Sequence, residues 1–301
     1  MQLVISGASG FVGSRLYSYL SEQGHICYTL VRHQPKNASE IFWDPYNKII
    51  DINTIKHADA FIHLSGANIA DSFWTQKRKK ILFDSRVKTT EFLAQSIVQL
   101  NDINKKFFVA SAIGYYGANP LPNTDETGVK GVGFLSDLCE AWEKAGQSTI
   151  NSHIKTVFMR FGVVMGGSGG FLQKMAKIYK WGLGGILGNE DAYISWIAIE
   201  DLCSAIHFLL LKENIDGIFN FVSPHPVTQK ELATYLSKTL RRPSFLRVPS
   251  FILEWLLRDM GRELFLANQN IYPARLIKEG FQFSYSHLHE YIEYLYKEQM
   301  L

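Results

Sequence analysis

The sequence predicts an α/β protein built on a doubly wound parallel sheet, with substrate-binding insertions in its second half and a C-terminal helical appendage. Three observations support this prediction. The apolar run Leu3 to Ile5 is followed by a glycine-rich turn and an amphipathic helical pattern that stops at Gly24. Further patterns of buried strands alternate with helical ones along the chain. The segment after Pro243 instead has the pattern of short helices.

The turn after the first strand carries Gly7, Gly10 and Gly13 at intervals of three. Gly7 permits a sharp turn, Gly10 lets backbone approach a ligand closely, and Gly13 lets the helix pack tightly on its strand. A second apolar strand, Cys27 to Val31, closes the βαβ unit. The start of the helix then faces a pyrophosphate with its free amides and positive end. We predict a Rossmann-like dinucleotide site, and an ordinary tight turn is the alternative.

The end of the second strand distinguishes between the two nicotinamide dinucleotides. A site for NAD usually has an acid there for the ribose 2′-hydroxyl, whereas a 2′-phosphate needs a cation. No acid occurs between Val31 and Glu40, but Arg32, His33 and Lys36 do. We therefore predict NADP(H), with the planar guanidinium of Arg32 on the 2′-phosphate. A solvated basic turn is the alternative.

Composition restricts the classes of function. The 301 residues are enough for one large α/β domain or for a nucleotide domain with a smaller partner. A net charge of +3 implies no nucleic-acid partner. Cys27, Cys139 and Cys203 are widely spaced and odd in number, as expected of buried thiols in a reducing compartment. His287 and His289 have no acid or thiol cluster around them, so no metal site is expected.

Targeting patterns point to a cytoplasmic protein. The first strand begins at residue 2, which leaves no room for a cleaved signal peptide. The later apolar stretch from Ile197 to Leu211 is interrupted by two acids and is too short to span a bilayer. We expect no membrane partner.

The middle of the first half continues the strand and helix pattern. A short strand at Phe42 to Asp44 ends at a proline. The residues from Ala58 to Ala67 form a buried strand that runs into a turn of small residues. His63 within it is expected to be a satisfied core residue, with a catalytic base as the alternative. The basic run at the start of the helical stretch 77–87 is expected to be a solvated helix face.

The next elements place two turns where a substrate could bind. The strand Lys106 to Ala112 is broken by Gly114 to Gly117. Thr156 to Met165 has the pattern of one apolar strand, followed by glycines and a helix at Phe171 to Tyr179. Gly182 to Gly188 is expected to be a mobile loop suited to covering a substrate.

The last part of the chain shows clear helix starts. Glu200 and Asp201 open an apolar helix, where acids complement the dipole, and a catalytic carboxylate pair is the alternative. Ile218 to Val222 is a strand, and Thr228 to Glu231 is a capping box before the next helix. The expected core contacts of the tail are Trp255, Leu256, Phe265, Leu276, Phe281 and Tyr291.

Several short motifs occur in a fixed order. The glycine triplet, 63–66, 111–117 and 196–201 resemble the successive landmarks of extended short-chain dehydrogenases/reductases. More narrowly, the segments 66–70, 73–75, 85–87, 160–164 and 182–185 resemble an atypical, epimerase-like subfamily that carries the description nucleoside-diphosphate-sugar epimerase. The resemblance covers nearly the whole chain, including a C-terminal segment at about 242–294 that this subfamily appends to the common fold.

The resemblance implies an NADP(H)-binding Rossmann/epimerase-like domain at 1–241, with its substrate elements mainly in 166–241, and an appended helical domain at 242–301. It implies that the cofactor is bound by turn and strand-end residues of the first half and by one residue further on. These residues are Gly7, Ser9, Gly10, Phe11, Val12, Gly13, Val31, Arg32, Leu64, Ser65, Gly66, Arg86 and Val164.

The chain departs from the extended dehydrogenases at their catalytic pair. Those enzymes use a Tyr with a Lys four residues later, the phenol as proton donor or acceptor and the ammonium lowering its pKa. No Tyr of this sequence has Lys at that spacing. Aligning on Trp142-Glu143 puts Leu135 at the tyrosine position and Cys139 at the lysine position.

The assisting serine of that mechanism is also displaced. Ala112 occupies its place, and the adjacent Ser111 is expected to point to the opposite face of its strand. Tyr115, Tyr116 and Ser111 are the hydroxyls best placed by sequence for catalysis. Aromatic packing around the turn is the alternative role for the two tyrosines.

Two hypotheses of function remain open. The first is an NADP-dependent oxidoreductase or epimerase-like enzyme that transfers hydride at nicotinamide C4 to and from an unidentified small-molecule substrate. The acids of Asn189-Glu190-Asp191 disfavour a substrate diphosphate. The second is an NADP(H)-binding regulatory protein without turnover, since relatives in the resembled family have been linked to cell division. We expect a monomer or a homodimer.

Overall fold

The structure is a computed structural model that describes residues 1–301 and separates into two compact units. The first unit contains 1–111, 138–160 and 203–219, and the second contains 112–137, 161–202 and 220–301. The chain therefore passes between the units several times, and each unit combines segments that are distant in sequence.

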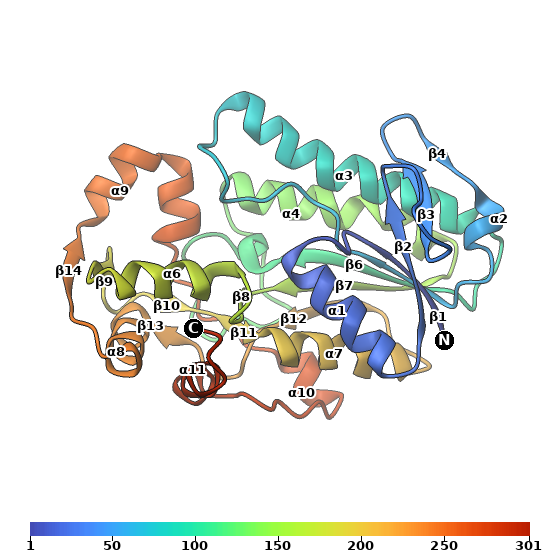
Figure 1. The fold of residues 1–301 in the computed structure, drawn as a ribbon. Coiled ribbons are helices and arrows are strands. Elements are labelled where there is room, and N and C mark those ends of the chain that lie inside the picture. The colour runs from blue at the N-terminus through green and yellow to red at the C-terminus, as the bar shows by residue number, and fades with distance from the viewer. The chain divides into compact units, whose positions relative to one another are not determined.

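The first unit is built around an eight-stranded sheet in the order β12-β7-β6-β5-β1-β2-β3-β4 (Figure 1). Its strands are β1 Gln2–Ser6, β2 Ile26–Val31, β3 Glu40–Asp44, β4 Ile49–Ile50, β5 Ala60–His63, β6 Lys106–Ala112, β7 Lys155–Phe161 and β12 Gly217–Phe221. β1 pairs in parallel with β2 and β5, β2 with β3, and β5 with β6. The α/β fold with a large parallel sheet is confirmed, although the edge pair β3-β4 is antiparallel.

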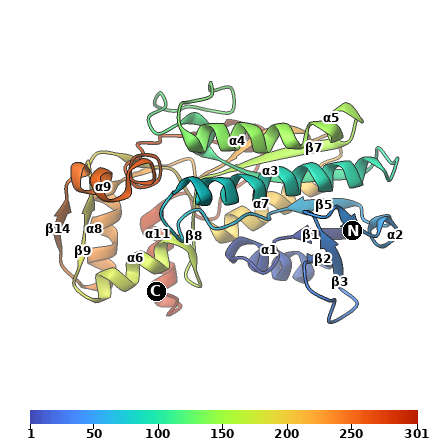
Figure 2. The ribbon, with the colours of Figure 1, turned by 90° about the horizontal axis from the view of Figure 1, so that it is seen from above.

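Helices cover both faces of this sheet (Figure 2). They are α1 Phe11–Glu22, α2 Ile52–Ile55, α3 Gln76–Val98, α4 Phe134–Ala145, α5 Gln147–Asn151 and α7 Ile199–Leu211. Leu3, Val4 and Ile5 of β1 are buried almost completely because helices lie over both sides of the central strand. The helix α1 buries Leu16 and Leu20 against it. The amphipathic spacing after the glycine turn thus forms the predicted βαβ unit.

The second unit combines small sheets with helices. Its elements are η1 Ile113–Tyr116, β8 Val163–Met165, α6 Gly170–Lys180, β9 Gly184–Leu187, β10 Tyr193–Ile194, β11 Trp196–Ala198, β13 Val227–Thr228, α8 Gln229–Leu240, β14 Ser244–Val248, α9 Ser250–Leu257, η2 Gly261–Phe265, α10 Ala274–Lys278 and α11 Leu288–Lys297. The strands form the pairs β10-β13, β11-β8 and β14-β9. A hydrophobic core joins α6, α8 and α11 through Leu172, Leu236 and Leu295. The capping box before α8 is confirmed.

The predicted strand from Thr156 to Met165 is wrong as a single element. It is divided at Gly162 into β7 and β8, and β8 pairs with β11 of the second unit. A Cβ at Gly162 would lie 2.7 Å from the Ser195 oxygen and from Cγ1 of Val222, so only glycine fits where the chain changes sheets. Apolar periodicity does not reveal such a change of partner.

The predicted mobile loop at Gly182 to Gly188 is also wrong, because Gly184–Leu187 forms β9. Its partner is β14, which lies in the appendage that the sequence predicted to be helical. A Cβ at Gly185 would meet the Leu246 oxygen at 2.1 Å, so the glycines permit close pairing of these strands. Glycines that are typical of a loop therefore also allow two strands to pair closely here.

The expected core contacts of the tail are correct in part. Leu276, Phe281 and Tyr291 are buried. Trp255 and Leu256 are not core residues, since they are 81% and 54% exposed. The three cysteines are free and buried, as predicted. None of the helices combines the length and apolar character that crossing a bilayer requires.

Candidate functional site

The glycine turn after β1 is shaped by two contacts within the chain. Gly7 has a φ of +75°, and a Cβ there would lie 2.8 Å from the carbonyl carbon of Leu64. A Cβ at Gly13 would lie only 2.1 Å from the oxygen of Gly7. Gly7 and Gly13 are therefore required by the packing of the turn itself.

Gly10 is different from the other two glycines. A Cβ there would meet the chain only at the Gly7 oxygen, 3.4 Å away, which is ordinary contact. Gly10 is exposed and is the N-cap of α1, and no side chain caps this helix start. The beginning of α1, at Phe11 and Val12, and the exposed Ser9 thus border an open, electropositive position without side chains in the way. Such a position can accept an anion.

A second turn packs against the first. β5 ends at His63, and the Leu64 amide donates to the oxygen of Ser6 at 3.1 Å, next to Gly7. The Ala67 amide donates to Oγ of Ser85 at 3.0 Å, which fixes this turn to α3. The two turns therefore form one continuous surface at the carboxyl ends of β1 and β5, the place where open α/β sheets bind ligands.

Arg86 lies against this second turn. A Cβ at Gly66 would be 3.1 Å from the Arg86 guanidinium carbon, and the guanidinium lies 5.0 Å from the centre of the Trp142 ring. Its Nη1 donates to the oxygen of Leu82 at 3.2 Å. Burial lowers the pKa of Arg86 to about 10, so the side chain keeps its positive charge at neutral pH. Gly66 thus makes room for a cation beside the turn, and the structure brings these two predicted residues together.

Arg32 follows Val31 at the end of β2, and its side chain is exposed. The nearby acids are bound within their own loops. Glu40 accepts a hydrogen bond from the Lys36 amide at 2.7 Å. The Asp44 carboxylate accepts from Asn47, which lowers its pKa, and the charge of Arg32 lowers that pKa further. Arg32 is therefore exposed at the strand end, where the sequence predicts a 2′-phosphate.

His63 is a satisfied core residue, as predicted. It is fully buried, with Nδ1 2.6 Å from Oγ of Ser6 and Nε2 3.2 Å from Oγ1 of Thr89. Desolvation lowers its pKa to about 3. The ring is therefore neutral at physiological pH and holds β5 to β1 and α3.

We expect His63 to make folding pH-dependent. Its folded-state pKa lies below the ordinary 6.5, so the unfolded chain binds the extra proton and stability falls as pH drops below 6.5. Between about pH 7.5 and pH 5 this residue should remove about 2 kcal/mol from the free energy of unfolding. His63→Gln should be less stable than the wild type at pH 7.5, but its free energy of unfolding should change less with pH. Urea unfolding at a series of pH values measures both. Parallel profiles of variant and wild type would contradict this account.

Ser111 belongs to a buried polar network. Its hydroxyl donates to Oε1 of Glu143 at 2.7 Å. The buried Arg160 donates to the same carboxylate from Nε at 2.7 Å and from Nη2 at 2.8 Å. Glu143 is therefore a paired anion that joins β6, β7 and α4. Ser111 thus has a structural partner, and this observation weakens its candidacy as a catalytic residue.

The two candidate tyrosines lie in η1 in the second unit. Tyr116 is buried, and its hydroxyl donates to Oδ1 of Asn220 at 2.8 Å. Tyr115 is half-buried, with its ring edge-on to Tyr116. Tyr116 thus has the aromatic packing role that was the alternative to a catalytic role. Val164, the remaining predicted cofactor residue, lies in β8 opposite Ile197 of the same unit.

The C-terminal segment holds the turn that carries these tyrosines. Nε2 of Gln269 donates to the oxygens of Ile113 at 3.2 Å and Gly117 at 2.7 Å. Glu263 accepts from the amides of Phe134 and Leu135 at the start of α4. Sequence patterns did not indicate Gln269 or Glu263, because their partners are more than a hundred residues away. Leu135, which the sequence comparison predicted at the tyrosine position, therefore lies at a helix start capped by Glu263 of the C-terminal segment.

Three acids of the second unit, Asp201, Glu200 and Glu190, have structural partners. Asp201 accepts from the amides of Ser284 and Tyr285 at 2.8 and 2.9 Å, and burial raises its pKa. Glu200 accepts from the Tyr291 hydroxyl at 2.6 Å. These bonds support the predicted structural role of this pair over the catalytic alternative. Glu190 lies 3.1 Å from Arg247, so its charge is compensated and the electrostatic argument against a diphosphate is weaker than the sequence indicated.

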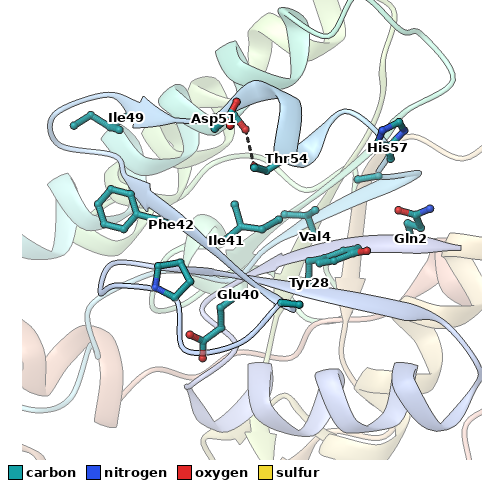
Figure 3. A pocket seen from close by; sticks show the side chains of 13 residues that line it. Gln2, Val4, Tyr28, Glu40, Ile41, Phe42, Ile49, Asp51, Thr54 and His57 are labelled. Carbon is teal, nitrogen blue, oxygen red and sulfur yellow. Dashed lines mark hydrogen bonds between the residues drawn. The ribbon is translucent and has the colours of Figure 1, made fainter.

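A cavity of about 440 Å³ lies between the first strands of the sheet and α2 (Figure 3). Val4, Tyr28 and Ile41 contribute to its lining. Thr54 of α2, a helix of only four residues, lies at one side of it. None of the residues assigned to the cofactor lines it. No group of three or more His, Cys, Asp or Glu side chains is arranged to hold a metal ion.

Comparisons with known proteins agree with this architecture. An epimerase family protein of Mycobacterium leprae is 34% identical over 292 residues, which are 97% of this chain and 94% of the relative. The crystal structure of the human epimerase family protein SDR39U1 (isoform 2) with NADPH matches with a TM-score of 0.86 and 25% identity, over 99% of both chains. A nucleoside-diphosphate sugar epimerase from Corynebacterium glutamicum matches with a TM-score of 0.81 and 27% identity, over 98% of this chain and 57% of that one.

Two sequence families account for most of the chain. Residues 248–295 match a domain of unknown function, DUF1731. Residues 3–221 match the NAD dependent epimerase/dehydratase family, and this match includes both turns at the end of the sheet. The resemblance inferred from the motifs is confirmed, and the chain belongs to the NAD dependent epimerase/dehydratase family with a C-terminal DUF1731 domain.

Proposed function

We propose that the first unit binds NADP(H) across the two turns at the carboxyl ends of β1 and β5. The observation that carries this proposal is Gly10, because the chain's own packing does not require a glycine there. Gly10 is the N-cap residue of α1, where no side chain caps the helix and the backbone is exposed. Ser9, Phe11 and Val12 complete this anion position. Leu64, Ser65 and Gly66 form the adjoining surface, and the half-buried Arg86 supplies a positive charge beside it.

We further propose that the cofactor is phosphorylated at the adenosine ribose. Arg32 is an exposed cation at the end of β2, and the acids near it are bound within their own loops. A guanidinium can bind a phosphate with two parallel hydrogen bonds. The family includes a human relative of the same fold that was crystallised with NADPH, which supports the same choice for this chain.

Arg32→Asp is expected to weaken NADPH binding by about 1.5–3 kcal/mol more than NADH binding, because a charge-assisted bond to the phosphate is lost. Titration of the purified variant with each dinucleotide measures the difference. Lys36→Asp makes the same change of charge at a nearby exposed position. Its losses of NADPH and NADH binding should differ by less than those of Arg32→Asp. Equal losses for both dinucleotides would show that Arg32 does not bind the phosphate.

We propose that the protein is an NADP-dependent oxidoreductase or epimerase-like enzyme acting on an unidentified small molecule. When bound, the nicotinamide ring supplies or accepts a hydride at C4. The three hydroxyl candidates for proton transfer are Tyr115, Tyr116 and Ser111, and two of them also make structural hydrogen bonds, Ser111 to Glu143 and Tyr116 to Asn220. The contacts of Gln269 hold the turn of Tyr115 in a fixed position.

The second candidate is an NADP(H)-binding regulatory protein without turnover. It is supported by the structural hydrogen bonds of Ser111 and Tyr116 and by the missing Tyr-x-x-x-Lys pair. Steady-state oxidation of NADPH across a panel of carbonyl compounds separates the two candidates. Oxidation that depends on one class of carbonyl supports the enzyme, whereas tight NADPH binding with no turnover on any of them supports the regulatory protein.

A further inference from the structure

The second unit carries an exposed apolar surface built from β14, α9 and the turn before β9, here named the β14–α9 face. Its exposed side chains are Trp181, Leu183, Phe245, Phe251, Ile252, Trp255 and Leu256. Both tryptophans are 81% exposed. Apolar residues scattered singly over a surface are normal, but a group of this kind marks a docking site.

Backbone pairing keeps these segments together. β14 pairs with β9, with Ser244 opposite Gly184, so Leu183 and Phe245 lie at the start of adjacent strands. The Tyr179 hydroxyl donates to a β9 oxygen, which brings the end of α6 to the same sheet. β14 continues directly into α9, and Figure 1 shows β9, β14 and α9 next to one another.

The exposed side of α9 is apolar. Helical spacing places Phe251, Ile252, Trp255 and Leu256 on one side. Leu253 and Leu257 are on the other side, where a Cβ at Gly261 would meet both residues. Amphipathic helices of soluble proteins turn their apolar side to the core. α9 has apolar residues on both sides, and the larger aromatic ones face solvent.

The segments that build this face are rich in exposed cations. Residues 174–183 and 237–258, which build it, contain eight Lys and Arg and a single acid, Glu254. All eight are exposed: Lys174, Lys177, Lys180, Lys238, Arg241, Arg242, Arg247 and Arg258. Glu190, from outside these segments, pairs with Arg247. The whole chain has a net charge of only +3, so the positive charge is concentrated here and the remainder is net negative.

We infer that the β14–α9 face binds the surface of an anionic lipid membrane. Exposed indole and phenyl rings fit the boundary between headgroups and acyl chains, and a rim of Lys and Arg binds anionic headgroups. The sequence led us to expect no membrane partner because no segment can span a bilayer. Binding at the membrane surface requires no such segment.

A second copy of the chain fits this face less well. A twofold interface would place the same cations opposite one another, and like charges repel. The open edge of β14 is also unsuited to pairing with another chain, because the strand is short, lies between Pro243 and Pro249 and carries the exposed Arg247. Charge complementarity therefore selects an anionic partner.

Vesicle flotation of the purified 301-residue chain tests this inference. The chain should float with vesicles of phosphatidylcholine and phosphatidylglycerol in equal parts, but not with phosphatidylcholine alone, and high salt should release it. Phe251→Ser with Trp255→Ser, and separately Arg241→Ser with Arg242→Ser, should each reduce partitioning about tenfold or more. Matched controls in the first unit are Ile103→Ser, at a 64% exposed apolar position, and Lys56→Ser with Lys77→Ser, at exposed cations.

The controls should partition as the wild type does. Flotation that does not depend on anionic lipid, or face variants that behave as the controls do, would overturn the inference. Sedimentation equilibrium without lipid tests whether the face instead joins two copies of the chain. A dimer that the aromatic variant converts to monomer would assign the face to self-association and defeat the proposal. The substituted positions are exposed, so an unchanged thermal transition verifies that the variants are folded.

Discussion

Replacement of Glu143 by alanine is expected to lower the free energy of unfolding by about 3–5 kcal/mol. The Glu143 carboxylate accepts two hydrogen bonds from Arg160, which is 1% exposed, and a third from Ser111. Removing the carboxylate leaves a guanidinium buried without this anion, and desolvation of that charge is then uncompensated. Chemical denaturation of the purified variant measures the loss.

Glu140→Ala is the matched control for this substitution. Glu140 is on the same helix and pairs with Lys144 at 3.0 Å, but this pair is at the surface and its loss should change stability by less than about 1 kcal/mol. The double variant Glu143→Met with Arg160→Met should recover much of the lost stability, because no charge is then buried. Equal losses for Glu143→Ala and Glu140→Ala would show that the network is not a buried ion pair in solution.

The glycine turn gives the second large effect, because Gly13 and Gly10 are glycines for different reasons. Gly13→Ala should destabilise the fold by about 2–3 kcal/mol and abolish NADPH binding, since its Cβ would lie 2.1 Å from the Gly7 oxygen and the turn must move. Gly10→Ala should change stability by less than about 1 kcal/mol, because its Cβ meets only one atom at 3.4 Å.

Gly10→Ala should nevertheless weaken NADPH binding about tenfold or more, because a methyl group would stand where the pyrophosphate approaches the start of α1. Thermal unfolding and dinucleotide titration of both variants separate packing from ligand contact. Normal NADPH binding by Gly10→Ala would mean that the dinucleotide does not lie on this turn, and the proposed function would lose its main support.

Local patterns were sufficient where an element is decided by its own residues. The run Leu3 to Ile5, the glycine turn and the following amphipathic spacing predicted β1 and α1, and the capping box predicted the start of α8. These elements follow from short-range sterics, capping and burial periodicity, which leave a direct trace in sequence. The sequence also placed His63 in the core correctly.

The contacts of the candidate catalytic residues were beyond the reach of sequence. Ser111 was a catalytic candidate by its position, but its partner Glu143 could not be identified from spacing. Asn220 and Gln269 carry no motif, because a single amide side chain acquires its role only when distant backbone is brought to it. Gly182 to Gly188 has the composition of a loop, and only pairing with β14 makes part of it a strand.

By itself, the sequence determined the α/β class, the glycine turn and the strand, helix and strand around it, because each depends on residues within a few positions of one another. Only the tertiary structure decided which hydroxyls are bound, which cations are exposed and which apolar residues remain in contact with solvent. Trp255 and Leu256 illustrate the difference, since apolar character predicts burial but cannot say whether a partner surface is present. Burial depends on long-range packing, and local residue preferences do not contain that information.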